Sequence, residues 1–108
     1  MKQIKLNRRA IKQGATLRGF ILEIQQPSDT FFVSALCQLR TADDQLVHEF
    51  DQELSATHIE FKPADGTLTK HFPIGELHFD VRISTSDGIE RVPFEGTQKI
   101  MHAWSRHE

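Results

Sequence analysis

Apolar and polar residues alternate with a period of two along most of the chain, which is typical of strands that bury one face. A strand is predicted over residues 17–24, where Phe20, Leu22 and Ile24 share one face, and the polar residues 25–29 end it. The clearest strand follows Gly75. There Leu77, Phe79, Val81 and Ile83 alternate with His78, Asp80, Arg82 and Ser84. This pattern indicates a sheet with one buried and one wet face.

The middle of the chain predicts a hairpin. Residues 31–40 are apolar on both faces, with Phe31, Val33, Ala35, Cys37 and Leu39 on one and Phe32 and Leu36 on the other. Such a run is typical of a central strand covered on both sides. Residues 41–45 have the composition of a turn, and residues 46–51 alternate again. We therefore expect these two segments to pair antiparallel.

Shorter strands are predicted in the rest of the chain. Residues 58–61 form one before the turn residues 63–66, and residues 86–88 predict a tight turn because Asp and Gly tolerate positive φ. Two more strands are predicted over residues 89–94 and 98–104, separated by a turn at 95–97. Pro93 cannot donate to a ladder, so its strand is expected to lie at an edge or to carry a bulge.

These elements predict an all-β fold. Six to seven short strands without an amphipathic helix are typical of an antiparallel β-sandwich or a small barrel. We expect an immunoglobulin-like sandwich. No Pro-rich or Gly/Ser-rich linker and no internal repeat divides the chain, so residues 1–108 are interpreted as a single domain.

Composition narrows the class of protein. The chain has 108 residues with one Cys, which excludes an internal disulfide framework and a zinc site built from thiolates. The longest nearly unbroken apolar run, residues 31–37, is interrupted by Ser34 and is far shorter than the ~20 residues that span a bilayer. No apolar segment of signal-peptide length follows Lys2 and Lys5. We expect neither membrane insertion nor an export signal.

Charge is distributed unevenly. Residues 1–22 carry six cations and no acid: Lys2, Lys5, Arg8, Arg9, Lys12 and Arg18. The other 86 residues carry seven cations and fifteen acids. A basic N-terminal segment is therefore attached to an acidic body, although the net charge is only −2.

Three carboxylates, Glu49, Asp51 and Glu53, would project from one side if the strand at 46–51 continued. A Ca²⁺ or Mg²⁺ site is one reading of this row, but these cations usually take ligands from a curved loop. A solvated or charge-guarded strand edge is the favoured interpretation. Among the six His residues, His78 and Asp80 form the best local pair, which is too few ligands for a transition metal. No metal or other cofactor is expected.

Catalytic motifs are not found in the sequence. The chain has no Gly-x-Ser-x-Gly elbow, and Cys37 lies in the most apolar strand, where a thiol is usually inert. The glycines Gly14 and Gly19 lack the spacing of a phosphate-binding loop. We do not expect an enzyme.

The basic segment has three possible uses. Clustered cations can bind nucleic acid, but the body is acidic and no aromatic residue interleaves with the cations as a stacking platform would require. A positive edge can instead meet a negative edge on another subunit and build a head-to-tail assembly. An unengaged surface is the third. Assembly is favoured over nucleic-acid binding.

A role in sugar binding is the usual proposal for a small β-sandwich, and it depends on exposed Trp and Tyr. This chain has no Tyr, and its single Trp104 ends the last predicted strand. We expect Trp104 to lie in the core or to clasp the terminus.

Three stretches carry a family resemblance. Residues 12–22 begin with Gly and a small polar residue before an alternating strand, residues 33–50 form the hairpin, and residues 72–88 form the clearest strand and turn before a closing strand that ends at Ser105 and Arg106. Their arrangement resembles small β-sandwich proteins and domains from tail and baseplate regions of tailed phages and prophages, including the N-terminal domain of baseplate upper proteins. Ser28-Asp29-Thr30 replaces the family's Asp-Leu-Thr-Gly, and Phe79 replaces its Tyr.

The resemblance implies a virion or prophage structural part without catalysis, and it transfers no binding residues. The function predicted from the sequence is a structural or adaptor module that contacts copies of itself or other phage structural proteins. Such a protein would be made in the bacterial cytoplasm and would reside in the virion. The basic residues from Lys2 to Arg18 are the predicted contact. The alternative is a binding module for carbohydrate or for a host protein.

Overall fold

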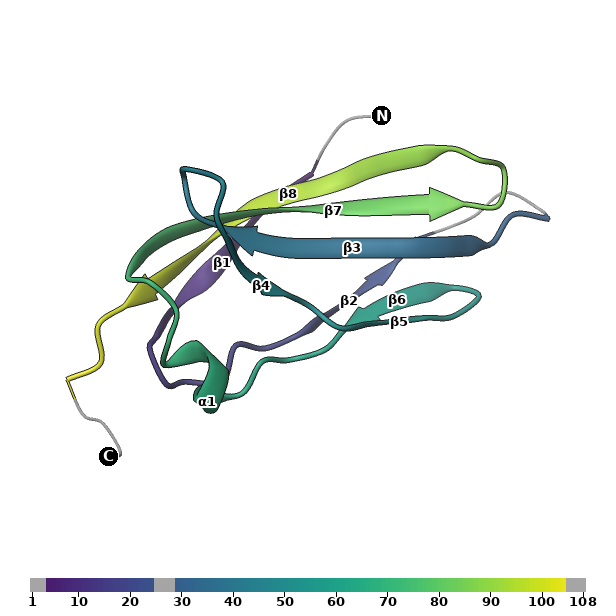
Figure 1. The fold of residues 1–108 in the computed structure, drawn as a ribbon. Coiled ribbons are helices and arrows are strands. Elements are labelled where there is room, and N and C mark those ends of the chain that lie inside the picture. The colour runs from purple at the N-terminus through teal and green to yellow at the C-terminus, as the bar shows by residue number, and fades with distance from the viewer. Residues whose placement is uncertain (1–3, 25–28, 105–108) are drawn as a thin grey trace.

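The structure, a computed structural model, describes residues 4–24 and 29–104. It contains eight strands and one short helix (Figure 1): β1 (Ile4–Lys12), β2 (Phe20–Glu23), β3 (Phe32–Arg40), β4 (Leu46–Glu49), β5 (Gln52–Leu54), β6 (His58–Phe61), α1 (Gly66–Thr69), β7 (Gly75–Thr85) and β8 (Glu90–Met101). The predicted all-β class is confirmed at this level.

The strands form two sheets. The larger has five strands in the order β1-β8-β7-β3-β4, and the smaller has three in the order β2-β6-β5 (Figure 1). Residues of both sheets contribute to one apolar core, in which Leu39, Phe50, Ile59, Phe61 and Val81 are almost completely buried. The alternation seen in the sequence therefore marks the faces that meet between the sheets.

The first strand differs from the expected antiparallel arrangement. Residues 4–12 form β1, which pairs parallel with β8, whereas the other paired strands run antiparallel. The alternation does not indicate this strand because its inner face carries Arg8 beside Leu6, and because a bulge shifts the register between Arg8 and Ile11.

The predicted turn at residues 95–97 is wrong, because β8 runs without interruption through it. Gly96 has no side chain, and this allows β1 to lie close to β8. A Cβ at Gly96 would lie 1.8 Å from the carbonyl oxygen of Leu6 and 2.9 Å from the Phe79 ring. The glycine that suggested a turn is thus needed for close strand packing.

The prediction that residues 31–40 form a strand covered on both sides is wrong, because one face of β3 is largely exposed. Its register against β7 shifts between Phe32 and Ser34, so Phe32 joins Ala35 and Cys37 in the core. Val33 is 56% exposed. A bulge places two consecutive residues opposite one and thereby breaks strict alternation.

The hairpins are confirmed with adjusted ends. Strand β3 pairs antiparallel with β4, which ends at Glu49 rather than at residue 51. The tight turn at 86–88 connects β7 to β8, where the Gly88 N–H donates to the Thr85 carbonyl at 3.0 Å and Gly88 has a φ of 80°. Pro93 lies at a register shift between these two strands, as its missing N–H predicts.

Helix α1 is not indicated by the alternation. Asp65 caps it, and its carboxylate accepts from the backbone N–H groups of Thr67 and Leu68 at 3.0 and 3.3 Å. The turn predicted at residues 63–66 therefore leads into a single helical turn. Figure 1 shows α1 beside the connection from β1 to β2, at the end of the molecule where β8 leaves its sheet.

Candidate interaction surfaces

The structure distributes the six predicted contact cations over several places. Lys2 lies outside the described residues. Lys5, Arg9 and Lys12 are exposed on β1, and Arg18 is exposed just before β2. Arg8 is partly buried and points in the opposite direction to its neighbours, toward the space between the sheets. The cations therefore do not form one patch.

Arg8 links the two sheets. Its guanidinium carbon lies 5.3 Å from the centre of the Phe20 ring and 5.8 Å from that of Phe50, and Nη2 donates to the Arg18 carbonyl oxygen. Within the described residues, Nη1 of Arg8 is a buried side-chain nitrogen with no hydrogen-bond partner. Burial lowers the pKa of Arg8, which the nearby Cys37 partly offsets.

Strands β1 and β2 form one open side of the molecule. In the described part of the chain, each is an edge strand of its sheet, and Arg8 on β1 donates to the carbonyl of Arg18, two residues before β2. The exposed cations on this side are Lys5, Arg9, Lys12 and Arg18. The basic charge of the N-terminal segment is thus presented along sheet edges.

Strands β4 and β5 form the opposite open side, which carries the acidic residues Glu49, Asp51 and Glu53. Strand β4 ends at Glu49, Asp51 follows it, and Glu53 lies on β5 in the other sheet, so the three predicted carboxylates do not share one strand face. Glu53 Oε2 lies 2.8 Å from Lys62 Nζ, which also contacts Glu60 at 3.0 Å. The carboxylates of Glu53 and Glu60 thus share one ammonium group on this side.

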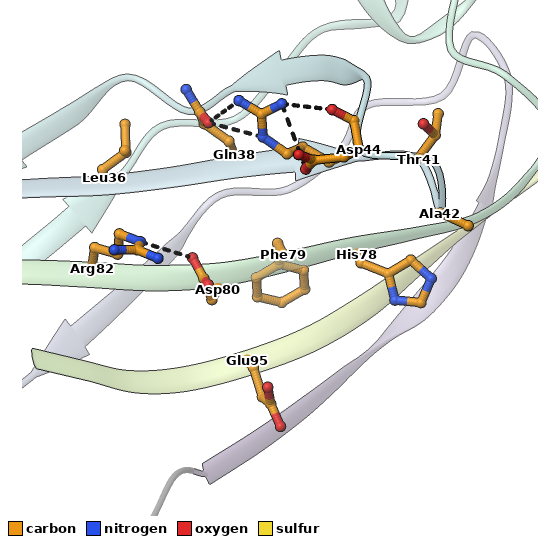
Figure 2. Close-up of a pocket in the computed structure, with 11 residues that line it drawn as sticks. Leu36, Gln38, Thr41, Ala42, Asp44, His78, Phe79, Asp80, Arg82 and Glu95 are labelled. Atoms are coloured by element: carbon orange, nitrogen blue, oxygen red, sulfur yellow. Dashed lines mark hydrogen bonds and ion pairs between the residues drawn. The ribbon is translucent and has the colours of Figure 1, made fainter.

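A polar hollow of about 700 Å³ lies on the sheet surface formed by β3, β7 and β8. Both guanidinium groups that line it are engaged by neighbours. Arg40 donates to Gln38 Oε1 at 2.9 Å and to the Asp44 carbonyl at 2.8 Å. Arg82 lies 3.8 Å from Asp80, and Figure 2 shows these two side chains facing each other. Because its arginines are already engaged, the hollow is a weaker candidate for ligand binding than the open edges.

The best histidine pair of the sequence also borders this hollow. His78 Nε2 lies 3.9 Å from Glu76, whereas Asp80 contacts Arg82. Among residues 4–24 and 29–104, no group of three or more His, Cys, Asp or Glu side chains is placed to hold a metal ion.

The exposure of Trp104 differs from the expectation. The side chain is 85% exposed rather than buried or clasped. It lines a groove of about 870 Å³ together with residues from the β1–β2 connection and the α1 region. Alternation alone misplaced this residue, because β8 ends at Met101 and the chain then leaves the sheet.

No protein-family model, curated protein or solved structure matches this chain. No helix of the described residues is long and apolar enough to cross a membrane.

The first prediction concerns Arg8. We expect Arg8→Met to unfold at the same urea concentration as the natural chain or a higher one, because Met keeps the apolar contact and removes a partly desolvated charge. Arg8→Ala should lower the free energy of unfolding by about 2 kcal/mol through lost packing. Arg9→Ala is the matched exposed control and should change it by less than about 0.5 kcal/mol. Equal losses for Arg8→Met and Arg8→Ala would contradict the inter-sheet role.

The second prediction concerns Cys37, which is fully buried. Burial raises the pKa of its thiol from 9.0 to about 12, with a smaller opposing effect of Arg8. Because the unfolded thiol ionises first, the stability contributed by the neutral thiol is complete below pH 9 and is lost between pH 9 and about 12.

We expect the free energy of unfolding to fall more steeply above pH 9 in the natural chain than in Cys37→Ala, by up to roughly 1.4 kcal/mol per pH unit. Urea unfolding at a series of pH values from 7 to about 10.5 measures both slopes. The loss of stability that the substitution causes at every pH does not affect the slope of the free energy of unfolding against pH, so the two slopes can be compared directly. Identical slopes in the natural chain and in Cys37→Ala would show that the thiol is not buried as described.

Proposed function

We propose that this protein is a non-catalytic structural or adaptor module that joins copies of itself through the open edges of its sheets. The fold is proposed to be an immunoglobulin-like sandwich. The resemblance of residues 12–22, 33–50 and 72–88 to tail and baseplate proteins supports a phage or prophage particle as its setting, with other structural proteins of that particle as further partners.

One observation carries the proposal: the strand order puts basic and acidic edges on opposite sides. Strand β1, with Lys5 and Arg9, is the first strand of the five-stranded sheet, and β4, with Glu49, is the last (Figure 1). An edge strand offers unpaired backbone N–H and C=O groups to another chain. Opposite charges then select which edge is bound.

Strand directions fit this contact. Strand β1 is parallel to β8, and three successive antiparallel pairings lead from β8 through β7 and β3 to β4. Strand β4 therefore runs antiparallel to β1. When one copy is placed beside the next in the same orientation, β4 of the first meets β1 of the second as an antiparallel pair. This heterologous contact extends the sheet from copy to copy.

Charge opposes the competing contact between two identical edges. Two β1 strands would bring Lys5 and Arg9 of both copies together, and such repulsion is a common protection against edge-to-edge pairing. Two β4 edges would likewise repel each other, because Glu49 and Asp51 of both copies are exposed and negatively charged. Only the head-to-tail arrangement joins opposite charges.

The third prediction tests this arrangement by light scattering coupled to size-exclusion chromatography. We expect the natural chain to associate at roughly 20 mM salt and to dissociate at roughly 500 mM, where the screening length falls to a few Å. The double variants Lys5→Glu/Arg9→Glu and Glu49→Lys/Asp51→Lys should each weaken association about tenfold or more.

A mixture of the two double variants should associate again, because each supplies the charge that the other has lost. Lys70→Glu reverses a positive charge that does not lie on an edge strand, and it serves as the control. We expect it to leave association unchanged. A monomeric natural chain at low salt, association that does not respond to salt, or a mixture that stays dissociated would each overturn the proposal.

A further inference from the structure

The groove beside Trp104 contains none of the four charged residues proposed to join the sheet edges, Lys5, Arg9, Glu49 and Asp51. It lies at the end of the molecule where β8 ends, and three separate segments form it: the connection after β1, the region of α1, and residues 103–104. Its volume of about 870 Å³ is within the range of small-molecule sites. The groove shares only Lys12, the last residue of β1, with the edge strands of the proposed assembly.

Hydrogen bonds fix the base of this groove. Thr69 is fully buried, and its hydroxyl oxygen accepts from the Gly14 N–H at 3.1 Å and donates to the Ala15 carbonyl at 2.6 Å. Gln13 joins the same base, because its N–H donates to the Met101 carbonyl at 2.9 Å and its Nε2 to the Phe72 carbonyl at 2.7 Å. One hydroxyl and one amide thus connect segments more than fifty positions apart.

Close backbone contact also shapes the groove. A Cβ on Gly66 would lie 2.2 Å from the Gly14 carbonyl oxygen, so the two segments touch as only glycine permits. Gly14 itself has a φ of 85°, in the left-handed region that favours glycine. The shape of the groove is therefore formed before any ligand arrives, which lowers the cost of binding.

The groove combines a flat apolar surface with positive charge. Trp104 is 85% exposed, and its ring lies 4.7 Å from that of His102 in a T-shaped contact that supports the indole from one side. Two lysines, Lys12 and Lys70, line the same groove, and its lining residues include no Asp or Glu. An exposed indole offers its face to the C–H groups of a sugar ring.

We propose that this groove binds an acidic sugar, with the sugar ring on the indole of Trp104 and its carboxylate bound by Lys12 and Lys70. The lysines favour an anion, because ammonium groups form charge-assisted hydrogen bonds with carboxylates. A single aromatic platform on a chain of net charge −2 suits one anionic ring better than a nucleic-acid strand, which requires successive stacking side chains and a basic path.

Intrinsic fluorescence provides a direct readout, because Trp104 is the only Trp and the chain contains no Tyr. We expect trigalacturonic acid to change the emission saturably, with a dissociation constant of roughly 1 mM or tighter. Neutral galactotriose is the matched sugar and should bind at least about fivefold more weakly, since it lacks the carboxylates. Adenosine monophosphate is the probe for a nucleotide site.

Variants locate the binding site. Lys12→Gln and Lys70→Gln keep the fluorescent residue and should each weaken binding of trigalacturonic acid by roughly two- to fivefold. Lys99→Gln, an exposed lysine of β8 outside the groove, is the control and should not change it. Trp104→Ala should abolish the binding heat measured by calorimetry. Unchanged urea midpoints would show that each variant remains folded.

Four results would overturn the proposal. These are no saturable response to trigalacturonic acid, equal binding of galactotriose, tighter binding of adenosine monophosphate, and lysine variants that bind like the control. Association of the natural chain in low salt is measured separately and at the sheet edges, so failure of either proposal leaves the other standing.

Discussion

Burial of one aromatic and aliphatic layer between two sheets of unequal size is the constraint on which the structure depends. The Phe20 and Phe61 rings stack at 4.8 Å, and Phe20 meets Phe50 edge to face at 5.7 Å. Phe20 and Phe61 belong to the three-stranded sheet, and Phe20 also lies 6.4 Å from Phe79 on β7 of the larger sheet, so the ring cluster links the two sheets. Since the inner faces are buried against each other, only the edges, the outer surfaces and the loops at the ends can contact other molecules.

The same constraint explains how a basic N-terminal segment can belong to a folded strand. The guanidinium of Arg8 lies over the Phe20 and Phe50 rings and donates to the Arg18 carbonyl, while Lys5 and Arg9 remain exposed. The segment therefore serves two purposes at once. Its inward residues fasten the two sheets together, and its outward residues make one side of the molecule electropositive.

The sequence predicted the elements whose burial alternates regularly. Strand β7 and the β3–β4 hairpin follow directly from period-two patterns, and Pro93 correctly indicated an irregular pairing. Strand β1 was missed because an arginine can cover core surface without appearing apolar. The turn predicted around Gly96 was wrong because glycine also permits close packing of strands, and only the position of Leu6 distinguishes the two uses.

The candidate sites were predictable in part. Charge asymmetry along the chain indicated an interaction surface, but the separation of basic and acidic edges required the strand order, which depends on distant pairings. The groove was not predictable, because Thr69 gains its role from Gly14 and Ala15, more than fifty positions away. Trp104 was expected to be buried because the pattern of β8 could not show where the chain leaves the sheet.

Hydrogen exchange measured by mass spectrometry on the natural chain at low and high salt tests the edge-to-edge account most directly. The account predicts that backbone amides of β1 and β4 become protected on association at low salt, while those of β7, already paired on both sides, change little. Protection confined to other segments, or association without added protection in β1 and β4, would contradict it.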